Sequence, residues 1–161
     1  MGNELRHFVP EFLEFRKACK AQGLDIPFLF HCGETLGVGT VVDGNLFDAI
    51  LLNSKRIGHG YAAARHPLIM DLLKEKNIAI ESCPISNEVL GLTPVTAGHH
   101  LPILLANDVP CTINSDNATF YRYVFICNLL DARFFQHPAV QKDPYPPTPY
   151  RALCNYNETY S

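Results

Sequence analysis

The sequence predicts an α/β fold built around a parallel β-sheet, and two observations support this prediction. Four short apolar runs each end in polar, chemically capable residues, as buried parallel strands do; the runs cover 26–31, 56–59, 78–83 and 109–115. Segments with helical character lie between the runs, which gives the order β-α-β-α-β-α-β. This order predicts right-handed crossovers, and four strands predict either an incomplete barrel or a small open sheet.

Helices are expected before and between these strands, where apolar residues recur and helix-ending residues follow. The expected ranges are 9–24, 45–53, a helix that opens at 66–67, and 100–107. Gly23 is a suitable C-cap for the first helix. Pro67 opens the third helix, because proline is favoured at the first helical position.

The pattern changes after Asn117, so two regions are predicted, 1–117 and 118–161. In the second region, 123–135 has the character of a helix. The stretch 143–150 (DPYPPTPY) is too rich in proline for regular structure, and the last residues form a loose tail.

The composition is that of one folded domain with a core of its own. The chain has 161 residues, of which 47% are hydrophobic and 18% charged. A formal net charge of −3 offers no basic surface, so nucleic acid is excluded as an expected partner. No apolar stretch approaches the ~20 residues that span a bilayer. The first residues do not have the pattern of a signal peptide, so a cytoplasmic location is expected by default.

The cysteines are expected to be buried, reduced thiols that act as small hydrophobic residues. None of the six belongs to a Cys-x-x-Cys pair, which disfavours a zinc ribbon or a thioredoxin-type motif. They stand at 19, 32, 83, 111, 127 and 154.

Chemically capable residues gather at the ends of three strands. His31 and Glu34 follow the first run, His59 stands between two glycines after the second, and Asp116 follows the fourth. Because active sites of parallel α/β proteins lie at the carboxyl ends of the strands, these residues predict one site. Imidazole and carboxylate groups can bind a metal or transfer protons.

Each of these residues also has a purely structural interpretation. His31 could be a hydrogen-bonded core residue, His59 part of a tight turn that needs glycine, and Asp116 a helix N-cap. Ser86 and Asn87, in the Cys-Pro-Ile-Ser-Asn segment, are good N-cap residues as well. The remaining histidines are expected to be surface or capping residues; they are His7, His66, His99, His100 and His137.

Four segments together resemble the metal-dependent adenosine deaminase superfamily, most closely the adenosine deaminase-related growth factors. They are FHCGET at 30–35, KRIGHG at 55–60, ESCPISNEVL at 81–90 and NSDN at 114–117. The resemblance runs from about Phe8 to Asn117. The family fold is a TIM-type (β/α)₈ barrel, so the chain is expected to form its last four βα units, followed by an irregular C-terminal tail. Vertebrate members of this branch are secreted, which implies an extracellular location if the whole protein is like them.

The resemblance implies zinc-dependent hydrolytic deamination of adenosine or 2′-deoxyadenosine, with inosine and ammonia as the products from adenosine. His31 and Asp116 would be zinc ligands. The family takes two further ligands from a His-x-His pair on its first strand, and this chain contains no His-x-His. Because tight zinc binding depends on a full set of ligands, the chain alone is expected to bind zinc weakly.

The same resemblance assigns the remaining site residues to the substrate. Glu34 would protonate N1 of the purine as water adds to C6, and His59 would orient and deprotonate that water. Gly33 would lie against the substrate. Asn117 stands where the family usually has a second Asp that accepts a hydrogen bond from the N7 side of the purine.

Two alternatives to an active deaminase remain open: a catalytically inactive fragment or pseudo-enzyme, and a growth-factor-like extracellular binding protein. A deaminase of the cytidine type is disfavoured, because that class uses Pro-Cys-x-x-Cys and this chain has Cys83-Pro84 in the reverse order. The expected partner is a purine nucleoside. Half a barrel would leave two open strand edges, so a homodimer or other self-association is also expected.

Overall fold

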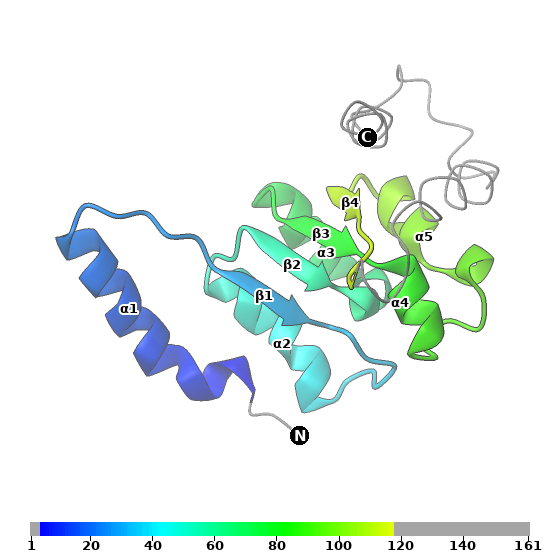
Figure 1. Cartoon of the computed structure of the whole chain (residues 1–161), viewed down its shortest axis with the longest axis horizontal. Helices are drawn as coiled ribbons and strands as arrows, with labels where there is room; N and C mark the ends of the chain where they lie inside the picture. The colour runs from blue at the N-terminus through cyan, green and yellow to red at the C-terminus, as the bar shows by residue number, and fades with distance from the viewer. Residues whose placement is uncertain (1–3, 118–161) are drawn as a thin grey trace, which may run out of the picture.

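A four-stranded parallel sheet forms the centre of the fold (Figure 1). The computed structural model describes residues 4–117. The strands are β1 (Leu29–Cys32), β2 (Arg56–His59), β3 (Ala79–Ser82) and β4 (Cys111–Ile113), in the spatial order β1-β2-β3-β4. All three neighbouring pairs are parallel, which confirms the predicted architecture. Within the described part of the chain, β1 and β4 are the edges of the sheet.

The helices alternate with the strands as predicted, although several boundaries differ. The α-helices are α1 (Val9–Ala21), α2 (Val41–Leu51), α3 (Pro67–Glu75), α4 (Pro84–Val89) and α5 (Leu101–Ala106). Short 3₁₀ helices cover η1 (Leu5–Phe8), η2 (Tyr61–Arg65) and η3 (Thr96–Gly98). None of the helices in residues 4–117 combines the length and apolar character needed to cross a membrane.

Helix α2 begins at Val41, four residues before the predicted start at Asn45. The Asp43 carboxylate accepts a hydrogen bond from the Gly39 backbone N–H at 2.9 Å. Gly44 N–H donates to the Thr40 carbonyl at 3.1 Å, which closes the first helical turn. An acidic side chain in the first turn that reaches back to a preceding N–H satisfies a donor that the helix itself leaves unpaired. This local bonding starts the helix upstream of the apolar residues that predicted it.

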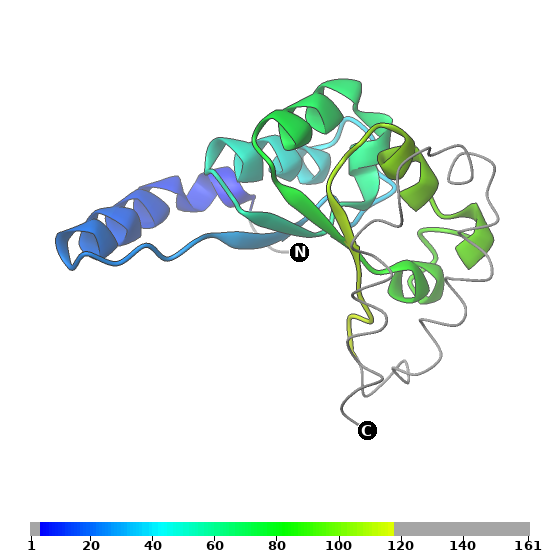
Figure 2. The same ribbon diagram turned by 90° about the horizontal axis from the view of Figure 1, so that it is seen from above.

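Helices α2, α3 and α5 lie on one side of the sheet, where they form the core with it (Figure 2). The largest fully buried apolar side chains come from these helices and from β2 and β3; they include Leu46, Ile57, Ile69, Leu73, Ile80 and Leu104. Each such side chain contributes roughly 1.5–3 kcal/mol by leaving water. On the other face of β1, Leu29 and His31 are exposed, so this face of the strand is open to a ligand.

The predicted burial of the cysteines is confirmed for Cys19, Cys32, Cys83 and Cys111. Burial raises the pKa of Cys32 and of Cys111 to about 12, so both stay protonated and unreactive at neutral pH. The other two cysteines, the predicted helix over 123–135 and the proline-rich tail lie outside the described residues.

Candidate active site

The parallel register brings two of the predicted site residues side by side. His31 of β1 pairs with Gly58 of β2, and Cys32 pairs with His59. The His31 and His59 rings meet edge to face, with centroids 5.0 Å apart. The adjacency follows from the sheet itself, because both strands run in the same direction and end at the same edge.

The two glycines around His59 are required by close packing. A Cβ on Gly58 would lie 2.5 Å from Cδ2 of the His31 ring, so only glycine leaves room for that imidazole. A Cβ on Gly60 would lie 2.5 Å from Cδ1 of Ile80, and Gly60 has a φ of +54°. His59 itself has a φ of 62°, a left-handed conformation that is uncommon for a non-glycine residue. The turn after β2 thus holds His59 in an unusual backbone conformation at the site.

His31, Glu34 and His59 form a compact cluster of potential ligands. One nitrogen or carboxylate oxygen from each lies within 4.8 Å of the others. The Glu34 Oε1 atom is 3.4 Å from His59 Nδ1. The His59 side chain is only 3% exposed, whereas Glu34 is 31% exposed. The cluster therefore has a buried imidazole behind a carboxyl and a second imidazole that face the open side of the sheet.

Asp116 follows β4 at the same edge but does not belong to this cluster. Its Oδ2 atom accepts a hydrogen bond from the Ser86 hydroxyl at 2.7 Å. Burial and the nearby carboxylates, Asp116 first, then Glu81 and Glu34, raise the pKa of Cys83 to about 12. Whether Asp116 is a metal ligand stays a prediction.

The structural alternative in which Ser86 and Asn87 are N-cap residues is wrong. Helix α4 begins at Pro84 with Cys83 at its N-cap position, so both polar residues lie inside the helix and are buried. Their side chains point to the site instead. Ser86 holds Asp116, and the Asn87 amide bridges two histidines, with Oδ1 3.1 Å from His59 Nδ1 and Nδ2 2.9 Å from His99 Nε2. The signal for this role was the pair of polar residues in the Cys-Pro-Ile-Ser-Asn segment that follows β3.

The prediction that His99 and His100 lie at the surface is also wrong. They are 4% and 9% exposed. Burial lowers the pKa of His99 to about 4 and, with the charges of His99 and Arg65, that of His100 to about 3. His99 does cap a helix, because its Nδ1 accepts a hydrogen bond from the Leu101 N–H at 3.0 Å. Because they lie in a segment without apolar periodicity, nothing in the local sequence indicated their burial.

The other predicted residues take varied positions. His7 is exposed as expected, while His66 is half-buried with Nε2 2.7 Å from the Asp43 carboxylate. Gly33, at a φ of +68°, is buried against Leu46, and its carbonyl accepts a hydrogen bond from Ala62 at 2.8 Å. Asn117 is exposed beside Asp116. His137 lies outside the described residues.

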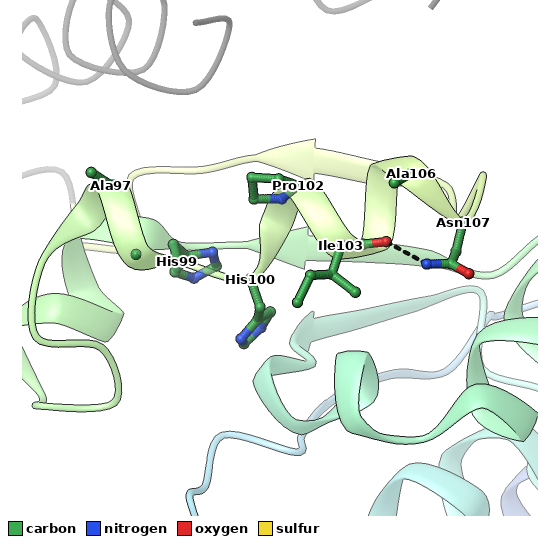
Figure 3. A pocket seen from close by; sticks show the side chains of 8 residues that line it. Ala97, His99, His100, Pro102, Ile103, Ala106 and Asn107 are labelled. Atoms are coloured by element: carbon green, nitrogen blue, oxygen red, sulfur yellow. Dashed lines mark hydrogen bonds between the residues drawn. The ribbon is translucent and has the colours of Figure 1, made fainter. Parts of the chain in front are cut away.

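A pocket of about 360 Å³ lies beside α5 and does not include the His31, Glu34 and His59 cluster (Figure 3). His99 and His100 line it from the segment that precedes the helix, and Pro102, Ile103 and Asn107 line it from the helix and its end. The pocket and the cluster are thus separate features. Asn87 links them, because it lies between His99 of the pocket and His59 of the cluster.

Comparisons with known proteins agree on one family. The family model described as "Adenosine deaminase" matches residues 1–129, so the similarity continues past Asn117, where the resemblance by motif ended. The chain is 38% identical over 115 residues to adenosine deaminase 2 of Homo sapiens, which covers 71% of this chain and 22% of that protein. It is 44% identical over 100 residues to adenosine deaminase 2-A of Danio rerio, which covers 62% of this chain and 20% of that protein. The chain thus spans about a fifth of the length of these relatives.

Solved structures with the same fold are deaminases. The crystal structure of adenine deaminase from Arthrobacter aurescens matches with a TM-score of 0.66 and 21% identity, over 99% of this chain and 49% of that chain. The N6-methyl-AMP deaminase of Arabidopsis thaliana matches with a TM-score of 0.52 and 17% identity, over 90% and 44%. Together with the four-stranded parallel sheet, the match to about half of each structure confirms the predicted partial TIM-type barrel.

Proposed function

This chain belongs to the adenosine deaminase family, and we propose that its strand-end site serves the hydrolytic deamination of adenosine or 2′-deoxyadenosine. The observation that carries the proposal is the cluster of His31, Glu34 and His59, which the fold assembles from residues up to 28 positions apart. In the reaction, water adds to C6 of the purine, the bond between C6 and the exocyclic nitrogen breaks, and ammonia leaves. The product keeps its ribose or deoxyribose unchanged.

The ligand atoms at the site are of the types that bind zinc. Zinc in catalytic sites is held by imidazole nitrogens and carboxylate oxygens, and both types lie within 4.8 Å of one another here. His31, which belongs to this cluster, and Asp116, which follows β4 outside it, are the residues that would hold the ion. When bound, zinc lowers the pKa of a water ligand from about 15.7 to ~7 and so makes hydroxide available at neutral pH.

Glu34 is the proposed acid. Its carboxyl is partly exposed on the open side of the cluster, where a purine can reach it. A proton delivered to N1 withdraws electrons from the ring and makes C6 more reactive towards water. Gly33, directly before Glu34, would meet the purine with its backbone, because a Cβ there would point at the Leu46 side chain.

His59 is placed behind the reacting groups. It is buried, and its Nδ1 faces Asn87 and Glu34, which leaves Nε2 as the nitrogen that can meet the attacking water. A buried imidazole held at one nitrogen has a defined orientation at the other. His59 would therefore fix the direction from which water reaches C6.

A second candidate is an inactive chain that retains site residues. The observation that favours it is the absence of any His-x-His sequence among the 161 residues, which leaves two of the expected zinc ligands unsupplied by this chain. On either alternative, the chain by itself should turn over adenosine very slowly.

The decay of adenosine absorbance during conversion to inosine, measured with added zinc, tests the proposal. Two proteins are compared: the 161-residue chain, and a chimera in which the preceding barrel strands of a relative such as adenosine deaminase 2 are joined to it. The chain alone should show little or no turnover, and the chimera should show turnover that Glu34→Gln abolishes. Glu75→Gln, on the exposed end of α3, makes the same chemical change away from the site and should leave turnover intact.

Three outcomes separate the alternatives. Turnover that survives Glu34→Gln would remove this residue from the proposed role of acid. A folded chimera that binds zinc yet shows no turnover would favour the inactive alternative. Rapid turnover by the chain alone would show that the site needs no further strand.

A further inference from the structure

Three side chains connect the start of α5 to the candidate active site. The Leu101 N–H donates to His99 Nδ1 at 3.0 Å, the Asn87 amide lies 2.9 Å from His99 Nε2, and its other end lies 3.1 Å from His59 Nδ1. All four residues are buried, with Asn87 and Leu101 at 0% exposure. In such a place each hydrogen bond must pair a donor with an acceptor, because no water can repair a mismatch.

The first bond determines the tautomer of His99. A backbone N–H can only donate, so Nδ1 of His99 must carry a lone pair. Burial lowers the pKa of His99 to about 4, so the ring is neutral at pH 7 and has one proton. That proton is therefore on Nε2, the nitrogen that faces Asn87.

The tautomer of His99 then determines how the Asn87 amide is turned. The two ends of an amide side chain have the same shape, and their partners decide which end is oxygen. If the NH₂ group of Asn87 faced His99, it would donate to Nε2 while the Leu101 N–H donates to Nδ1. Both ring nitrogens would then need a lone pair, and a neutral imidazole has a lone pair on only one of them. The amide must therefore be turned end for end from the orientation described above, so that its oxygen faces His99 and its NH₂ group faces His59.

We propose that His99 is a positioning residue which, through the Asn87 amide, holds His59 in the tautomer that carries its proton on Nε2. In the turned amide the NH₂ group of Asn87 occupies the position of Oδ1, 3.1 Å from Nδ1 of His59, and donates to it, so Nδ1 has no proton. The competing contact is with Glu34, whose carboxylate would favour a proton on Nδ1. At 3.4 Å it lies beyond the usual range of such a hydrogen bond and is the weaker influence.

If the site has the proposed function, on which this step rests, the tautomer of His59 decides what His59 does in the reaction. With a proton already on Nε2, His59 donates a hydrogen bond to the attacking oxygen and does not take a proton from it. His59 then stabilises and directs the nucleophile. The proton that water loses passes to Glu34, which has given its own proton to N1 and is left as a carboxylate. Only a role for His59 as donor is compatible with this tautomer in the resting protein.

Long-range ¹H–¹⁵N correlation spectra of the ¹⁵N-labelled, metal-free chain at pH 7 test the inference without turnover. Such spectra show which ring nitrogen of each histidine carries the proton, in solution or, for associated protein, by magic-angle spinning of a sediment. The wild-type chain should show His59 protonated at Nε2. A proton on Nδ1 in the wild-type chain would overturn the inference, and because this measurement needs no variant, misfolding of a variant cannot obscure it.

Variants then test the route through Asn87. Asn87→Asp presents oxygen to both histidines, so the proton of His59 should move to Nδ1. His99→Leu removes the group that turns the amide, so the Nε2 tautomer of His59 should lose its dominance. His100→Leu is the matched control, since it is the same change at a neighbouring buried histidine whose Nε2 has no hydrogen-bond partner within residues 4–117. If His59 keeps its proton on Nε2 in folded Asn87→Asp and His99→Leu chains, the contacts from His99 through Asn87 do not determine its tautomer. The deaminase proposal would stand in that case, because it is judged by turnover.

Discussion

Replacement of Gly60 by alanine should destabilise the protein far more than the same change at Gly23. Both glycines have left-handed backbones, with φ of +54° and +70°. They differ in the space around them. A Cβ at Gly60 would lie 2.5 Å from Cδ1 and 3.1 Å from Cγ2 of Ile80, whereas a Cβ at Gly23 would have no atom within 4 Å.

The two costs at Gly60 can be estimated separately. A left-handed conformation costs an alanine about 1–2 kcal/mol. Forcing a methyl group into a packed core costs about 1–3 kcal/mol more. Ile80 cannot turn towards solvent to relieve the clash, because its side chain is 0% exposed. The expected loss of unfolding free energy is therefore about 2–5 kcal/mol for Gly60→Ala and about 1–2 kcal/mol for Gly23→Ala.

Urea denaturation followed by far-UV circular dichroism measures the difference, since the chain has no Trp to report by fluorescence. With a slope of about 2 kcal/mol per molar urea, an extra loss of about 2 kcal/mol lowers the midpoint by about 1 M. Equal midpoints for the two variants would refute the reasoning, because they would show that the turn after His59 has room for a side chain. The measurement is made at low protein concentration to limit association.

Four further predictions concern pH, zinc, association and substrate. His99 and His100 have lowered pKa values in the folded chain, about 4 and about 3, so the unfolded chain binds more protons between about pH 6.5 and pH 3. Stability should be unaffected by these two groups above pH 6.5 and fall as the pH drops below it, and urea midpoints of His100→Leu should fall less steeply over this range. Dialysed chain should hold less than one equivalent of zinc by elemental analysis, because it supplies no His-x-His pair; a tightly held full equivalent would contradict this. Because β1 and β4 are open edges of the sheet within the described residues, the chain should associate. Analytical ultracentrifugation should show dimers or larger species. A purely monomeric chain would show that these edges do not serve as contact sites. In the chimera, Asn117→Asp should raise turnover of adenosine by up to roughly 10²-fold, because an ionised acceptor binds the purine more strongly; Asp116→Asn should lose zinc and turnover together, and no effect at Asn117 would show that this residue does not contact the substrate.

The sequence alone determined the positions of the strands and the residues at their ends. Apolar runs of strand length, separated by helical segments, place β2 at the residues found, Arg56–His59. His31 and His59 could be expected to meet, because parallel neighbouring strands end at the same edge of a sheet. These are properties of local patterns, and a pattern of apolar and polar residues along the chain is sufficient to predict them.

Only the tertiary structure decided how the site is supported. Asn87 contacts a histidine 28 residues before it and another 12 residues after it. Ser86 contacts an aspartate 30 residues away. Ser86 and Asn87 have the same residue types that cap helices, and His99 lies in a segment without periodicity, so their local sequence is equally compatible with an exposed position. They are buried because the short helix α4 packs beside the segment before α5 at the ends of the strands. Contacts between elements depend on how those elements pack in three dimensions, and the residue pattern within each element does not contain that information.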